Sequence, residues 1–222
     1  MLILGISLQY PLKEYLNNIN LINNKKHNSR SNFCEYYNII GKFSNFDYKP
    51  FISYYKVNEK EINEKKMIVC VDKNYLYNEE AKLVFSKKLA EEKLKNQMNK
   101  LMLNIEIMKK IEGKNEENEN VVKYYEYFEN EKEFAIVMEL CNYTLLDYLT
   151  KKEKPFNLEE IYNILSQLNN TFKIMSDLKI THSNINLDNI YIKENKNKKL
   201  IFKISFENCG FSESILSNLL DI

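Results

Sequence analysis

The stretch Ile180-Thr-His-Ser-Asn-Ile-Asn-Leu-Asp-Asn-Ile-Tyr-Ile192 separates two segments of different period. Upstream, apolar residues keep a helical period behind Asn157-Leu-Glu-Glu160, an asparagine version of the capping box. Downstream, Asn189 to Lys193 predicts a short strand, and a second strand from Leu200 to Phe206 follows an Asn/Lys turn. The sequence therefore predicts a helix over Leu158 to Leu178, a polar loop and a two-stranded hairpin, in this order.

The segments before this stretch predict strands around one long helix. Val121 to Phe128 and Glu133 to Leu140 are typical of a hairpin. A helix is expected from Asn78 to Gly113, because its apolar residues recur at spacings of three and four. Residues 1–32 are Asn-rich and predict a weakly ordered leader. Three more strands are expected at Tyr36 to Gly41, Ile52 to Val57 and Met67 to Val71.

Composition indicates a folded and nearly neutral chain. Of the 222 residues, 44% are hydrophobic, and 16 Tyr with 12 Phe argue against a disordered tract. The 32 basic residues balance 31 acidic ones, so no field of the whole chain attracts nucleic acid or an anionic membrane. We expect neither as a partner. About one residue in seven is Asn, which we interpret as AT-rich coding.

The cysteines and the apolar runs point to an intracellular protein. Cys34, Cys70, Cys141 and Cys209 are widely spaced and accompany only two histidines, so neither zinc spacing nor a disulfide framework is visible. The apolar start Met1 to Leu8 lacks a basic segment and a cleavage site, and no run approaches the roughly 20 residues of a membrane span. The expected location is cytoplasmic or otherwise intracellular.

Several separate segments together resemble one family. Phe134-Ala-Ile-Val-Met-Glu-Leu-Cys141, followed by Thr144-Leu-Leu-Asp-Tyr-Leu149, looks like the fifth strand, hinge and following helix of a eukaryotic protein kinase. The stretch Ile180 to Ile192 resembles that family's catalytic loop, H-R-D-L-K-x-x-N. Asn208-Cys-Gly210 stands where the family has D-F-G. The order and spacing of these segments carry the resemblance, which covers residues 33–222.

The resemblance implies an α+β, protein kinase-like fold. Residues 33–140 would form a five-stranded antiparallel small lobe with one long helix, and residues 141–222 a partial, mainly helical large lobe. Phosphoryl transfer in this family needs a Lys on the third strand, a Glu on the long helix, a catalytic Asp and two metal-binding groups. Each of these positions can be compared with the residue that stands there.

Most of the charged positions carry other residues. Asp72 stands in the Lys position of the third strand, and Asn104 stands where the helix Glu is expected, with Glu106 as the alternative if the helix register slips. In the catalytic loop His182 matches. The remaining comparisons are Ser183 for Arg, Asn184 for the base Asp, Asn186 for Lys, Asn189 as the matching metal-binding Asn, and Asn208 for the D-F-G Asp, with Glu207 next to it.

These replacements remove the chemistry that the family uses. An amide does not take a proton near neutral pH, and losing a general base typically costs a hundred- to ten-thousand-fold in rate, to order of magnitude. The nucleotide positions that the resemblance implies are Gly41, Val69, Met138, Glu139 and Cys141. The Gly-rich loop keeps only Gly41, and Phe43 is expected to fill the nucleotide pocket. The corresponding expectation is that ATP binds weakly, if it binds, and with little help from magnesium.

Three interpretations follow from this pattern. The first is a catalytically inactive pseudokinase that acts as a binding or regulatory module, and the second is a weakly active ATP-dependent serine/threonine kinase. The third is a non-functional truncated fragment, because the sequence stops twelve residues after Gly210 without an A-P-E segment. The apolar stripe of the helix Leu158 to Leu178 has no evident cover, so a protein partner or a second copy of the chain is expected there.

Overall fold

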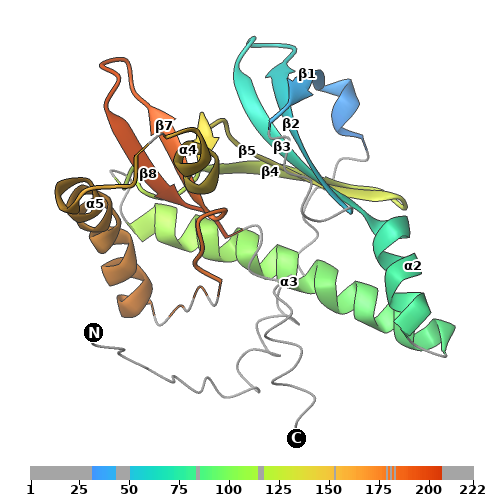
Figure 1. Ribbon diagram of the computed structural model, residues 1–222. Helices are drawn as coiled ribbons and strands as arrows, with labels where there is room; N and C mark the ends of the chain where they lie inside the picture. The colour runs from blue at the N-terminus through green and yellow to red at the C-terminus, as the bar shows by residue number, and fades with distance from the viewer. Residues whose placement is uncertain are drawn as a thin grey trace, which may run out of the picture.

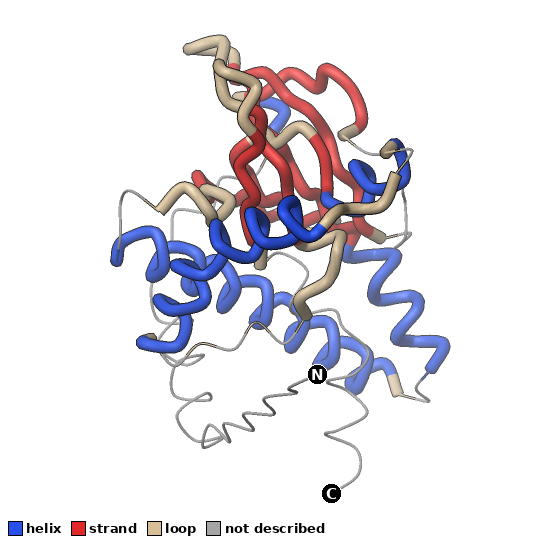
Figure 2. Tube along the Cα trace, turned by 60° about the vertical axis from the view of Figure 1, so that its left-hand side comes forward, coloured by secondary structure: helices blue, strands red, loops and turns tan. Residues whose placement is uncertain are grey.

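A computed structural model describes residues 32–43, 51–83, 86–114, 118–152, 154–178, 180, 182 and 184–206. It contains a five-stranded sheet and a three-stranded sheet, with the long helix α3 (Lys87–Lys114) running beneath the strands (Figure 1). Turning the molecule shows the strands gathered above and the long helices below them (Figure 2). The proposed leader lies almost wholly outside the described residues, as does Asn208.

The large sheet is antiparallel throughout. Its order is β1-β2-β3-β5-β4, so the last two strands form the predicted hairpin with β5 inside the sheet. A β-bulge interrupts the pairing of β1 with β2 between Ile39 and Gly41. The strands span Tyr37–Lys42 (β1), Ile52–Glu59 (β2), Lys65–Asp72 (β3), Tyr124–Glu129 (β4) and Glu133–Glu139 (β5).

Both faces of this sheet are covered, because side chains alternate along each strand. On β3, Met67, Val69 and Val71 belong to the main hydrophobic core that includes α3. Ile68 lies on the opposite face in a second cluster, which is closed by the short 3-10 helix η1 (Phe33–Glu35). Residues of odd number on β3 therefore face the interior between sheet and helix, and residues of even number face outward.

The long helical region consists of two helices rather than one. The structure has α2 (Lys73–Leu83) and α3 (Lys87–Lys114), whereas the sequence predicted a single helix from Asn78. Helix α2 begins earlier because the Asp72 carboxylate accepts a hydrogen bond from the Tyr75 N–H at 2.9 Å, as an N-cap residue does. The predicted apolar stripe of α3 is confirmed, since Leu101, Ile105 and Met108 are fully buried.

The second sheet contains the two strands of the predicted C-terminal hairpin and one short additional strand. It pairs β6 (Tyr143–Thr144), β7 (Ile190–Glu194) and β8 (Leu200–Ile204), with helices α4 (Leu145–Lys151) and α5 (Leu158–Asp177) beside it. The predicted capping box of α5 is confirmed: the Glu160 N–H donates to Asn157 Oδ1 at 2.9 Å, and the Asn157 N–H donates to Glu160 Oε2 at 2.8 Å.

The expected fold class is confirmed by these elements. A five-stranded antiparallel sheet is combined with one long helix, and a smaller, helix-rich region follows it along the chain. Among the described residues, no helix has both the length and the apolar character needed to cross a membrane.

Candidate functional site

The polar loop before β7 is built around His182, whose side chain is buried. Its Nε2 lies 2.8 Å from the Ser205 carbonyl oxygen, and its Nδ1 lies 3.3 Å from the Asn184 backbone N. A neutral ring that donates from Nε2 and accepts at Nδ1 satisfies both contacts. Burial lowers the pKa of His182, which favours this neutral form. The ring also packs against Phe206, with centroids 4.6 Å apart.

Asparagine side chains hold the same loop in place. Asn186 Oδ1 accepts from the backbone N–H groups of Asp188 and Asn189 at 2.9 and 3.0 Å. The Asn186 amide donates to Asn184 Oδ1 at 3.1 Å, and the Asn189 amide donates to the Asn184 carbonyl oxygen at 2.7 Å. The three asparagines thus bond to one another and to the loop backbone. They define the turn between the buried histidine and β7.

The loop itself orients the side chain of the residue expected to bind a metal. Asn189, the expected metal position, is 1% exposed, and its amide nitrogen is bonded to the loop. Magnesium is usually bound through carboxylates and phosphates. Within the described part of the chain, no three His, Cys, Asp or Glu side chains come close enough to hold a metal ion. Asn208 and Glu207 lie outside the described residues.

The expected Lys position on the third strand provides no charge on the face of β3 that meets α3. Asp72 is exposed at the outer end of β3, where it caps α2, so it does not face the interior. The interior face of β3 carries Met67, Val69 and Val71, and Val69 is 2% exposed. Lys73 reaches away to the β4–β5 turn, with its Nζ 2.6 Å from Glu129 Oε1.

The helix position where the family has a Glu carries Asn104, a neutral amide, on α3. Asn104 is 5% exposed, and its Nδ2 atom is buried without a hydrogen-bond partner. Glu106, the alternative for the helix position, is partly exposed beside Lys109, whose Nζ lies 3.4 Å away. The described residues of β3 and α3 therefore bring together no lysine and glutamate between strand and helix.

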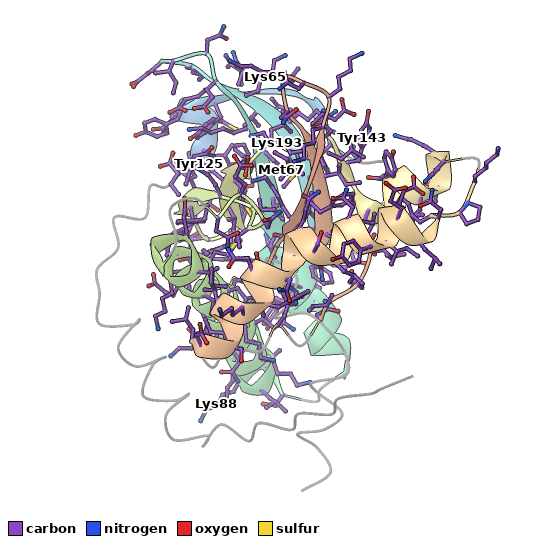
Figure 3. The ribbon with its side chains drawn as sticks, turned by 90° about the vertical axis from the view of Figure 1, so that its left-hand side faces the viewer. Lys65, Met67, Lys88, Tyr125, Tyr143 and Lys193 are labelled. Carbon is purple, nitrogen blue, oxygen red and sulfur yellow. The ribbon has the colours of Figure 1, made fainter. Side chains whose placement is uncertain are left out.

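The expected hinge carries an ion cluster that the sequence analysis missed. Glu139, at the end of β5, is 4% exposed and forms ion pairs with Lys203 of β8 at 3.1 Å and with Lys193 of β7. Figure 3 shows where Lys193 lies, between Tyr125 and Tyr143 in that view. Burial by itself would raise the pKa of Glu139, but the two ammonium groups outweigh it and hold this pKa below its usual value.

A signal for this cluster was present in the sequence. Lys203 interrupts the apolar run Leu200-Ile-Phe-Lys-Ile204, and a lysine in a buried strand needs a partner. The partner itself lies 64 residues away and is brought close only by the fold. The other two expected hinge positions, Met138 and Cys141, are buried at 0% and 2% exposure.

The loop after β1 places an aromatic ring between the two sheets. Phe43 is 9% exposed, and its ring centroid lies 5.9 Å from that of Tyr191 on β7. Its backbone N–H donates to the Tyr54 carbonyl oxygen at 2.9 Å, which connects Phe43 to β2. A Cβ at Gly41 would meet nothing within 4 Å, so no close approach requires a glycine there. The expectation that Phe43 fills a nucleotide pocket stays a prediction.

Comparisons with known proteins point to one family. A model of the family described as "Protein tyrosine and serine/threonine kinase" matches residues 65–211, which is more than half of the 222 residues. A probable serine/threonine-protein kinase zyg-1 of Caenorhabditis briggsae is 33% identical over 86 residues. Serine/threonine-protein kinase PLK2 of Mus musculus is 27% identical over 77 residues, and serine/threonine-protein kinase polo of Drosophila melanogaster is 29% identical over 75 residues.

These relatives are much longer than the matched region. The three alignments cover 38%, 35% and 34% of this chain, but only 12%, 11% and 13% of the respective relatives. The similarity therefore concerns only a small part of the length of those proteins.

Proposed function

The chain belongs to the protein tyrosine and serine/threonine kinase family, and we propose that it is a catalytically inactive member that acts as a binding or regulatory module. The observation that carries this proposal is the packing of Phe43 against Tyr191 between the two sheets. A Gly-rich loop in this family covers the phosphates with its backbone. Here the equivalent loop inserts a ring, which competes with a nucleotide for the space.

The missing charges support the same proposal. Transfer depends on electrostatic stabilisation of the phosphoryl group by a strand Lys, a helix Glu and bound metal ions. The interior face of β3 is apolar, and the helix position on α3 is occupied by Asn104, a buried neutral amide. Asn184 cannot act as a base, because an amide does not accept a proton near neutral pH. Each change weakens a separate part of the mechanism.

A transfer assay tests the inactive state. The purified chain is incubated with γ-labelled ATP, magnesium or manganese and a general protein substrate such as casein. We expect no labelling above a sample without enzyme. Labelling that is lost in Glu106→Gln or Glu207→Gln would contradict the proposal and favour the weakly active serine/threonine kinase. Lys88→Glu, a change on the exposed start of α3, controls for unspecific effects.

A thermal shift series tests nucleotide binding separately. We expect ATP to raise the melting temperature little, with or without magnesium, because the Phe43 ring packs on Tyr191 between the two sheets and the described residues hold no carboxylate cluster for a metal ion. A large rise that depends on the metal would contradict the expectation. The melting temperature reports binding because a ligand that binds only the folded state stabilises that state, and the stabilisation grows with the ratio of ligand concentration to Kd.

The proposed module needs a binding surface, and we propose the exposed apolar side of α5. Leu158, Ile161, Tyr162 and Leu165 lie at spacings of three and four, and their exposed fractions are 86%, 41%, 75% and 58%. Such a stripe favours cover by a protein partner or a second copy of the chain. Self-association is tested by sedimentation velocity: it should be present in the parent and lost in Leu158→Lys/Leu165→Lys. A monomeric parent at all concentrations would contradict self-association.

A further inference from the structure

A small pocket lies between α4, α5 and β8, away from the Phe43 ring and the catalytic-loop asparagines. Its volume is about 140 Å³. The walls are largely apolar: Tyr148, Phe156, Ile164, Leu200 and Phe202 line it. Glu160, Asn163 and Lys199 complete the lining. The pocket thus combines an apolar interior with polar and charged groups.

The pocket has room for one side chain. A protein cavity of about 150 Å³ lined by Leu, Ile and Phe binds benzene, so 140 Å³ suits a single aromatic ring or a branched aliphatic group. One wall is held firmly, because the rings of Tyr148 and Phe156 stack with centroids 6.1 Å apart and planes 12° apart. Lys152 lies over the Phe156 ring at 4.2 Å and pairs with Glu160, so the one carboxylate in the lining already has a cation.

A basic turn lies directly beside the pocket. Lys196, Lys198 and Lys199 of the β7–β8 turn are exposed, and none of the three has an ion-pair partner among the described residues. The turn is ordered by Asn195, whose side chain accepts from the backbone N–H groups of Asn197 and Lys199, each at 2.9 Å. The only carboxylate within the hairpin sequence 190–204 is Glu194. The turn therefore presents a positive edge next to an apolar hole.

We propose that this pocket and turn bind an acidic peptide segment of a partner protein. One apolar side chain of the segment, aromatic or branched, enters the pocket between Phe156 and Leu200. Acidic residues on either side of it face Lys196 and Lys199. The apolar hole supplies affinity because it removes the inserted group from water, and the charge complementarity supplies orientation and association rate. The site is separate from the α5 stripe and from the Phe43 region, so it stands whether or not nucleotide binds.

Fluorescence anisotropy with the full chain tests this inference. The probe is a fluorescein-labelled heptapeptide with phenylalanine at its centre and three glutamates on each side. We expect it to bind at least about tenfold more tightly than the same peptide with alanine at the centre, because the buried ring is lost. Binding of the phenylalanine peptide should weaken as salt is raised.

Two variants separate the pocket from the charges. Asn163→Phe places a ring at the rim, so it should remove the preference for phenylalanine over alanine. Lys196→Glu/Lys199→Glu should weaken the binding of the phenylalanine peptide at least about fivefold and should make this binding less dependent on salt. The matched control is Lys88→Glu/Lys95→Glu, which changes the net charge equally on α3. Figure 3 shows Lys88 at the far end of the molecule from Lys193.

Each outcome decides the question. Equal affinity for the two peptides, or an equal loss in the control double variant, would overturn the proposal. Tighter binding of a ten-nucleotide oligouridine than of the peptide would also overturn it, since the lysines would then serve nucleic acid. If Asn163→Phe lowers the melting temperature, the lysine double variant and the alanine peptide carry the decision.

Discussion

The change Glu139→Gln is expected to destabilise the protein strongly, although it is nearly isosteric. Glu139 Oε2 lies 3.1 Å from Lys203 Nζ, and the two side chains are only 5% and 3% exposed. Without the carboxylate, the Lys203 ammonium remains buried beside a neutral amide. Lys193 behaves differently, because its side chain is 40% exposed and can turn to water. The cost therefore comes mainly from Lys203.

The expected magnitude follows from this geometry. Removing one partner of a buried ion pair typically costs 3 to 5 kcal/mol, so we expect a loss of about 3 kcal/mol in the free energy of unfolding. For a chain of this size, about 1 kcal/mol corresponds to roughly 2 to 4 °C, so the melting temperature should fall by about 6 to 12 °C. Urea unfolding followed by circular dichroism measures the free energy directly.

A double-mutant cycle identifies the cause. Lys203→Met alone should also destabilise, because it leaves Glu139 with a single, partly exposed cation. Glu139→Leu/Lys203→Met removes both buried charges and should cost clearly less than the sum of the single changes Glu139→Leu and Lys203→Met. Additive single changes, or a Glu139→Gln variant within about 0.5 kcal/mol of the parent, would refute the reasoning.

The same cluster predicts how stability depends on acid. The pKa of Glu139 is held below its usual value in the folded state, so the unfolded chain takes up the proton first as the pH falls. The stabilisation is fully present above the unfolded pKa, about 4.3 for a glutamate. It is lost as the pH falls from there through the lower folded pKa. Glu139→Gln should remove this contribution, and an unchanged acid slope would contradict it.

Three further changes test other parts of the structure. Phe43→Ala should lower the free energy of unfolding by about 3 kcal/mol. It should also let excess adenosine raise the melting temperature. An equal rise in the parent would contradict the proposal that the Phe43 ring occupies the space of the nucleoside. Asn104→Leu should raise the free energy of unfolding by about 1 kcal/mol, because a buried donor without a partner is removed. A lower free energy of unfolding in urea would show that the amide has a hydrogen-bond partner. Burial lowers the pKa of His182, so stability should fall as the pH drops below about 6.5, where the unfolded chain protonates first. His182→Gln should flatten this slope between pH 5 and 7, and an unaltered slope would assign it to other groups.

Local periodicity predicted most of the elements. The strands of the large sheet, the α5 capping box and the apolar stripe of α3 each depend on residues close in sequence, so period and end signals were sufficient. The sequence does not predict the start of α2, because the resemblance places Asp72 at the Lys position of the third strand. Its place at the last position of β3 lets its carboxylate cap the next helix instead.

The sequence alone determined the family pattern and the loss of charge, because which residues stand at the motif positions is a property of residue order. It also gave the element types, since hydrophobic period reflects local geometry. Tertiary structure alone decided which face of β3 meets α3, that Phe43 packs on Tyr191, and that Glu139 pairs with Lys203. These facts join residues far apart along the chain. They depend on how alternating faces and sheets are brought together, which no local pattern encodes.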